Sequence, residues 1–241
     1  MTYALFVRRE KMIELITIIA CVISIIILKF AFQIQFKEIA KFKNKSNSEL
    51  DEITKKLPDN EEVCKEILAQ LENHSNVAIK QEEESRDCLY MIFNNTILLG
   101  RFKADFIRIQ TIAHECLHSI QNKATLWFNY IFSNMVLLYF AVISILTLFN
   151  KIGNTNAQLV ILLIMSAVQY AIRAYLENDA MAKAPYVAKE YLESKQVAPE
   201  QIKHLMEEYT QVNSVGVPFT NFQLLCKNIM KVIFYCIFIL V

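Results

Sequence analysis

Two histidines and a glutamate in the middle of the chain have types and spacing that suit metal chemistry. His114 and His118 stand four residues apart, so on an α-helix their side chains project from one face, one turn apart. Imidazoles placed in this way can bind one Zn²⁺, and Glu115 beside them can act as a general base toward water. The apolar residues of Thr111–Gln121 favour an amphipathic helix that packs on a core while it carries this site. The alternative interpretation is that the histidines are ordinary core or surface residues.

The third ligand is expected after a membrane hairpin. A catalytic zinc site with two histidines needs one more protein ligand, and its fourth position is left for water. Residues 124–149 and 157–172 are apolar segments that we expect to cross a bilayer and return, so the chain after residue 172 lies on the same side as His118. Glu177 is the first glutamate or aspartate there, which makes it the predicted third ligand.

Other polar residues around Glu177 have less specific roles. Glu177 itself could instead form a surface pair with Arg173, which would contribute little to stability. Asp179 is expected to hydrogen-bond to one of the ligand histidines. A donor for a developing oxyanion is also needed, and the sequence does not choose among four candidates, which are Arg173, Tyr175, Tyr186 and His204.

The composition indicates a membrane protein. Hydrophobic residues make up 54% of the 241 residues, with only three glycines. The net charge of +1, without a block of Lys or Arg, gives no indication of nucleic-acid binding, and the isolated glycines give none of a nucleotide phosphate loop. The six scattered cysteines, without a C-x-x-C motif, predict free buried thiols rather than a disulfide framework or a zinc knuckle.

The order of apolar and polar segments predicts a mainly α-helical membrane protein. We expect three to four transmembrane helices and a zincin-like α+β region, made of a small β-hairpin and the HExxH helix. The first apolar segment lacks a small-x-small cleavage site, which favours a retained anchor over a signal peptide. Five regions are predicted, namely an anchor (1–36), a membrane-proximal region with the HExxH helix (37–123), a transmembrane hairpin (124–172), a third-ligand helix and loop region (173–218) and a C-terminal transmembrane or interfacial helix (219–241).

The membrane-proximal region has several expected elements of its own. An amphipathic helix is predicted over 61–73, and residues 81–86 read as a solvated charge run. Short β-favouring segments at 88–93 and 96–99 predict a hairpin, which is either purely structural or an exposed edge to which an extended peptide can add. Near the C-terminus, two prolines and a glycine predict a loop–helix–loop arrangement over 199–218.

The ordered set of these motifs resembles the neutral zinc metallopeptidase family of small bacterial membrane proteins. More distantly it is similar to the prenyl-protein endopeptidases and the heat-shock membrane metallopeptidases. The resemblance covers about residues 61–184 and is carried by Ala113-His114-Glu115-x-x-His118-x-x-Gln121, two spans, and Glu177-x-Asp179-Ala180. It implies a gluzincin-like unit among membrane helices, in which His114, His118 and Glu177 bind zinc and Glu115 is catalytic. The sequence departs from the family at Cys116-Leu117, where a Val-Gly-like pair is typical; we expect Cys116 to face the core.

Together these features predict a zinc-dependent endopeptidase in a multi-pass cell-membrane protein. Its substrate would be a peptide or a membrane protein presented at the bilayer surface, and Lys and Arg near the span ends favour a cytoplasmic active site. A non-catalytic zinc-binding scaffold or pseudopeptidase is the alternative. An intramembrane protease of the site-2 type is disfavoured, because no Asp lies in a later span, and a zinc transporter lacks mid-membrane ligands. Nothing in the sequence indicates an oligomeric state.

Overall fold

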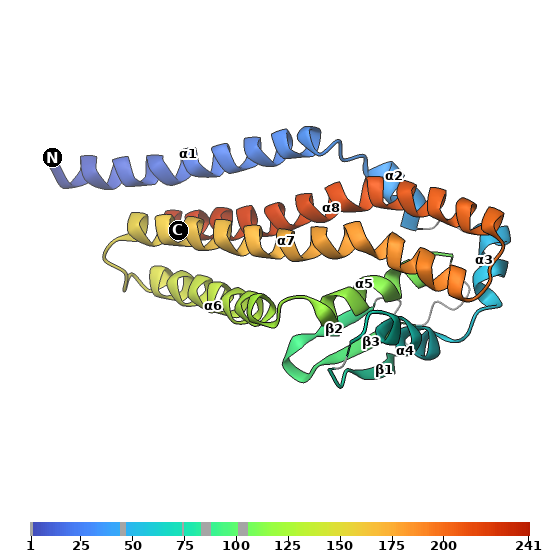
Figure 1. Cartoon of the computed structure of the whole chain (residues 1–241). Helices are drawn as coiled ribbons and strands as arrows, with labels where there is room; N and C mark the ends of the chain where they lie inside the picture. Colours follow the sequence, from blue (N-terminus) through green and yellow to red (C-terminus); the bar gives the residue numbers. More distant parts are fainter. Residues whose placement is uncertain (1, 44–46, 74, 83–87, 101–105) are drawn as a thin grey trace. The chain divides into compact units, whose positions relative to one another are not determined.

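The computed structural model describes residues 2–43, 47–73, 75–82, 88–100 and 106–241 (Figure 1). It is mostly helical with one small sheet, which confirms the mainly α-helical fold class. The chain forms two compact units. The membrane unit consists of Met1–Ile34, Phe128–Ala174 and Pro218–Val241, and the site unit consists of Gln35–Trp127 and Tyr175–Val217.

Four helices of the described chain are long and apolar enough to cross a membrane. These are Met12–Ala31 within α1 (Thr2–Ala31), α6 (Lys123–Leu148), α7 (Thr155–Ser194) and α8 (Pro199–Leu240). Many large apolar side chains of α1 and α6 are exposed in the protein, as expected where lipid rather than water is the neighbour. The structure therefore has the architecture of an integral membrane protein, at the upper end of the predicted number of spans.

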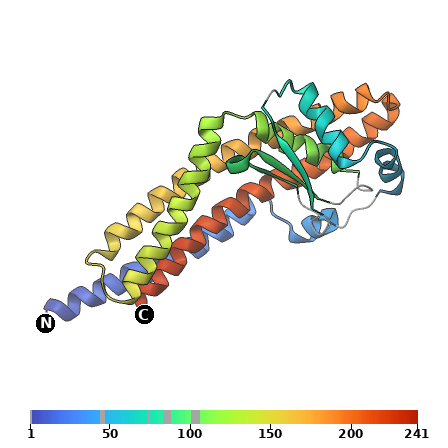
Figure 2. The same ribbon diagram turned by 90° about the horizontal axis from the view of Figure 1, so that it is seen from below.

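Within the membrane unit, α6, α7 and α8 pack side by side (Figure 2). Their shared core is apolar and includes Ile143, Leu162 and Val232. The charge of Lys231, which interrupts the last apolar segment of the sequence, is held by polar groups: Nζ donates to Gln169 Oε1 at 2.8 Å and to Asn228 Oδ1 at 3.0 Å. Pairing of this kind is how a lysine is accommodated inside a helix bundle.

The C-terminal third differs from the sequence-based expectation. The predicted loop–helix–loop over 199–218 is wrong, because α8 runs without a break from Pro199 to Leu240 and contains Pro218 in its interior. The helix has buried side chains on both sides of this proline, such as Leu205, Tyr209 and Phe222, and their packing outweighs the lost backbone hydrogen bond. The third-ligand helix predicted after residue 173 is present as the continuation of α7 to Ser194.

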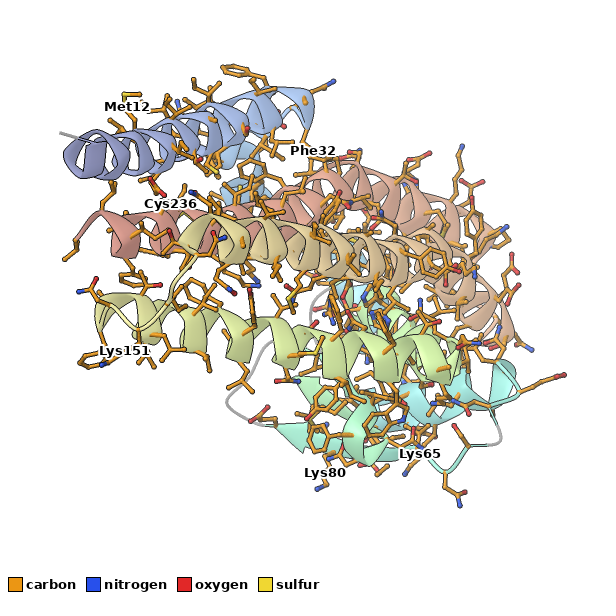
Figure 3. All side chains as sticks on the ribbon, turned by 90° about the vertical axis from the view of Figure 1, so that its left-hand side faces the viewer. Met12, Phe32, Lys65, Lys80, Lys151 and Cys236 are labelled. Atoms are coloured by element: carbon orange, nitrogen blue, oxygen red, sulfur yellow. The ribbon has the colours of Figure 1, made fainter. Side chains whose placement is uncertain are left out.

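The site unit begins with three short helices, α2 (Phe36–Lys43), α3 (Ser48–Lys55) and α4 (Asn60–Gln70). Asn47 caps α3, and the side chain of Asp59 caps α4 by accepting the backbone N–H of Glu62 at 2.9 Å. One face of α4 is buried, as its amphipathic pattern predicts, and packs against α5 (Arg108–Ile120). Lys65 of α4, on the opposite face, extends outward at the surface of the site unit (Figure 3).

A three-stranded sheet completes the site unit. The predicted hairpin is present as β2 (Leu89–Met91) and β3 (Thr96–Gly100), which pair antiparallel through a turn that ends at Asn95 with φ of 48°. The strand β1 (Ala78–Glu82) pairs parallel with β3 and gives the order β1-β3-β2. The sequence does not predict a strand at this position and indicates a charge run over 81–86 instead; residues 83–86 lie outside the described residues. The residues of β1 are polar and mostly exposed, so their sequence alone does not indicate a strand. They form one because they pair with the buried β3.

Candidate metal centre

His114 and His118 of α5 and Glu177 of α7 converge on one point in the site unit. The two histidine Nε2 atoms are 3.0 Å apart. Glu177 Oε2 lies 3.4 Å from His114 Nε2 and 3.6 Å from His118 Nε2. Among the described residues, these three form the group of histidine and carboxylate side chains that can hold one metal ion. The structure thus brings together the three residues that the sequence selects as ligands.

The spacing of these atoms fits a zinc ion. Ligand atoms held tetrahedrally at about 2.1 Å from a metal lie about 3.4 Å from one another. The observed separations of 3.0, 3.4 and 3.6 Å are close to that value. Two imidazole nitrogens and one carboxylate oxygen are also the donor set found in catalytic zinc sites that leave a fourth position for water.

The helix α5 is held rigidly because its opposite face is part of the core. Ile109, Ile112, Ala113 and Cys116 are completely buried, and Cys116 Sγ lies 3.6 Å from Cys64 Sγ of α4. This confirms that Cys116 faces the core. On the other face, the ligand side chains retain slight exposure, between 10 and 18%. The site is therefore largely shielded from solvent but remains open to it.

Glu115 lies on α5 next to the ligands and is almost fully buried. Its Oε2 accepts a hydrogen bond from the backbone N–H of Tyr90 in β2, at 2.6 Å. Burial raises the pKa of Glu115 above its usual value, although His114, His118 and the Tyr90 hydrogen bond act in the opposite direction. A carboxylate in such surroundings has a stronger tendency to accept a proton than an exposed one.

The electrostatics at His118 favour positive charge. Burial by itself lowers the pKa of His118, but the contact with Glu177 and the charges of Glu115 and Glu177 outweigh burial, so the pKa is raised overall. The acids that favour a protonated imidazole would equally favour a bound cation at the same position.

Gln121, directly after α5, connects the two halves of the site. Its Oε1 is 2.9 Å from His118 Nδ1, and its Nε2 donates to the backbone carbonyl of Leu176 at 2.8 Å and to Asp179 Oδ2 at 3.1 Å. The other oxygen of Asp179 is paired with Lys183 at 2.5 Å. Asp179 is expected from the sequence to bond to a ligand histidine directly; the structure places the Gln121 side chain between them. The sequence assigns no role to Gln121, although a glutamine three residues after a ligand histidine is a visible signal.

The predicted oxyanion donors are not distinguished by the structure. Tyr175 and Tyr186 are each 67% exposed. The side chain of His204 is 62% exposed and lies 3.9 Å from Glu207. Arg173 belongs to the membrane unit. The identity of this donor stays an open prediction.

Comparison with models of known protein families finds no match for the chain. No curated protein and no solved structure shows a significant match. The resemblance to membrane zinc metallopeptidases therefore stays an expectation from the motifs. What the structure itself defines is a helical protein with four membrane-length apolar helices and a His-His-Glu cluster suited to a metal ion, within the described residues.

Proposed function

We propose that the protein is a zinc-dependent membrane endopeptidase that hydrolyses peptide bonds near the membrane surface. The observation that carries this proposal is the convergence of His114, His118 and Glu177 at zinc-like spacing, with the buried carboxylate of Glu115 on the same helix. A purely structural zinc site has no use for an additional buried acid beside its ligands. The four apolar helices support the location in a membrane.

The chemistry divides between the metal and one side chain. A zinc ion bound by the three ligands would polarise the scissile carbonyl and lower the pKa of a water molecule toward about 7. Glu115 takes a proton from the attacking water, whose oxygen forms a bond to the carbonyl carbon. The C–N bond then breaks, and Glu115 transfers its proton to the leaving amine nitrogen. The carboxylate is thereby regenerated for the next cycle.

The position of strand β2 favours a peptide as the substrate. In the described part of the sheet, β2 is an edge strand, and its residue Tyr90 points its N–H away from β3 toward Glu115. Because that N–H is already bonded to Glu115, an extended peptide would lie alongside this edge, with its backbone beside the catalytic carboxylate, rather than pair with Tyr90 itself. We propose this as the substrate path. The substrates would be peptides or membrane proteins presented at the bilayer surface, and the active site would lie on the cytoplasmic side.

Replacement of Glu115 by glutamine tests the proposal. The amide of the Glu115→Gln variant still offers an oxygen to the Tyr90 N–H, so the fold and the zinc content should be retained. Cleavage of an unfolded casein-type protein should fall by about 10²–10⁴-fold, the usual contribution of a general acid–base group. The control is Glu52→Gln, at a glutamate whose side chain is 61% exposed and pairs with Lys55; it should cleave like the wild type.

Two results would contradict the proposal. Cleavage by the Glu115→Gln variant at the wild-type rate would remove Glu115 from its role. Stoichiometric zinc in a wild-type protein that cleaves neither casein nor membrane-tethered peptides would show the non-catalytic scaffold instead.

A further inference from the structure

The amide of Gln121 can take only one orientation in its surroundings. Its Nε2 faces the backbone carbonyl of Leu176 at 2.8 Å, and a carbonyl oxygen can only accept. The amide nitrogen must therefore be on that side, where it also reaches the Asp179 carboxylate at 3.1 Å. The remaining atom, Oε1, is consequently the one that faces His118 Nδ1 at 2.9 Å.

This orientation decides the tautomer of His118. Because Oε1 is an acceptor, Nδ1 must carry the hydrogen, and a neutral imidazole then has its lone pair on Nε2. His118 Nε2 is the atom that lies 3.0 Å from His114 Nε2 and 3.6 Å from Glu177 Oε2. Gln121 thus directs the free electron pair of His118 toward the other two ligands.

The same amide fixes the position of the third ligand. Leu176, whose carbonyl accepts from Gln121, directly precedes Glu177 in α7. Gln121 is the first residue after α5, and its side chain contacts both His118 on that helix and the Leu176 carbonyl on α7. One side chain therefore contacts a ligand of α5 and the backbone beside the ligand of α7.

We infer that Gln121 is a positioning residue for the metal site, which selects the metal-binding tautomer of His118 and holds Glu177 where both side chains can bind one metal ion. Asp179, itself paired with Lys183 at 2.5 Å, acts through Gln121 and holds the amide in this orientation. The inference rests on the zinc site of the proposed function but not on hydrolysis.

The chain offers a matched control for Gln121. Gln110 is the same residue type, lies on α5 itself, is 8% exposed, and donates to Asn213 Oδ1 of α8 at 2.6 Å. It thus links α5 to another helix as Gln121 does, but this bond goes to Asn213 rather than to a histidine. Methionine has a similar length and no amide, so Gln110→Met removes one interhelical hydrogen bond, and Gln121→Met removes two as well as the contact with His118.

The test measures zinc affinity of the full-length protein in detergent by competition with a chromogenic chelator. Gln121→Met should weaken zinc binding by about 10–100-fold, the usual effect of losing a group that orients a metal ligand. Gln110→Met should stay within about threefold of the wild type, because its amide contacts no ligand. Thermal unfolding of the metal-free proteins should show a modest loss for both variants, so a large difference between them in zinc affinity reports positioning rather than general packing.

A charge-matched rescue adds a second readout. Gln121→Glu keeps an acceptor for His118 but places a carboxylate against Asp179, and zinc binding should weaken. Combining it with Asp179→Asn, which supplies an N–H donor to the new carboxylate, should restore part of the affinity. The inference fails if Gln121→Met binds zinc like the wild type, if Gln110→Met loses as much affinity, or if the double variant shows no recovery. Each result is independent of whether the protein cleaves peptides, so a failure of the proposed hydrolysis is distinguishable.

Discussion

Arg108 provides the most demanding test of how the site unit is held together. It lies in the first turn of α5, ahead of His114, and is completely buried. Its guanidinium donates to the backbone carbonyls of Thr54 at 2.7 Å and Pro58 at 2.8 Å, and to Asn60 Oδ1 at 2.8 Å. The Thr54 carbonyl at the end of α3 also accepts the backbone N–H of Leu57 at 3.2 Å, and Arg108 adds a charged donor to it. This one side chain therefore joins α3, the α3–α4 turn, α4 and α5.

The loss of folding stability on replacing Arg108 follows from these contacts. Arg108→Met keeps much of the side-chain volume but leaves the acceptors buried without their charged donor. Hydrogen bonds to charged groups contribute about 1.5–3 kcal/mol each, and the lower desolvation cost of methionine offsets part of the loss. We expect a net destabilisation of about 3–5 kcal/mol, which raises the unfolded fraction of the site unit by about two to four orders of magnitude.

Hydrogen–deuterium exchange of the protein in detergent measures this change. Amides of α3, α4 and α5 in Arg108→Met should lose protection together, because the side chain links all three helices. The control is Lys55→Met, a cation whose side chain is 52% exposed and pairs locally with Glu52; its effect should stay below about 1 kcal/mol. Equal protection of the two variants would refute the idea that the buried guanidinium holds the site helix in place.

Two further predictions concern the metal ligand of α7 and the pH dependence of the fold. Glu177→Ala should remove stoichiometric zinc from the purified protein, as measured by atomic emission, while circular dichroism remains helical; full zinc content in this variant would exclude Glu177 as a ligand. Burial raises the pKa of Glu66, but its bonds to Lys195 and Tyr191 outweigh that effect, so the pKa is lowered overall. A group with a lowered pKa in the folded state stabilises above its unfolded pKa of about 4.3, and this stabilisation is lost as the pH falls through the lower folded pKa. The melting temperature of Glu66→Gln should therefore lie below that of the wild type at pH 7 and approach it in acid; a constant gap would contradict this assignment.

Local periodicity and segment length explain what the sequence predicts correctly. The i, i+4 spacing of His114 and His118 places both side chains on one face of a helix. The lengths of the apolar spans are set by the thickness of the bilayer. The choice of Glu177 depends on one topological step, an apolar hairpin that returns the chain, and the structure places this residue beside both histidines. The first two inferences need only local geometry, and the third adds only the return of the chain through the hairpin.

The features that the sequence does not predict depend on partners distant in the chain. The strand β1 exists through its pairing with β3, and α8 continues through Pro218 because residues on either side are packed. Arg108 is a charged residue with 0% exposure, against the usual preference of arginine for the surface. Its burial becomes understandable only when the carbonyls of α3 and its turn are placed around it.

The three ligands differ in how their positions are secured, and this difference determines where the site is most sensitive. His114 and His118 belong to one helix whose opposite face is buried core, so their separation is fixed by the backbone of α5 itself. Glu177 reaches them from another helix, and the bond from Gln121 to the Leu176 carbonyl joins the end of α5 to α7 directly beside it. Changes in α7 near this point should therefore alter metal affinity before they alter the fold. Conversely, changes in the buried face of α5 should reduce stability and zinc binding together, because the same backbone carries the core residues and both histidines.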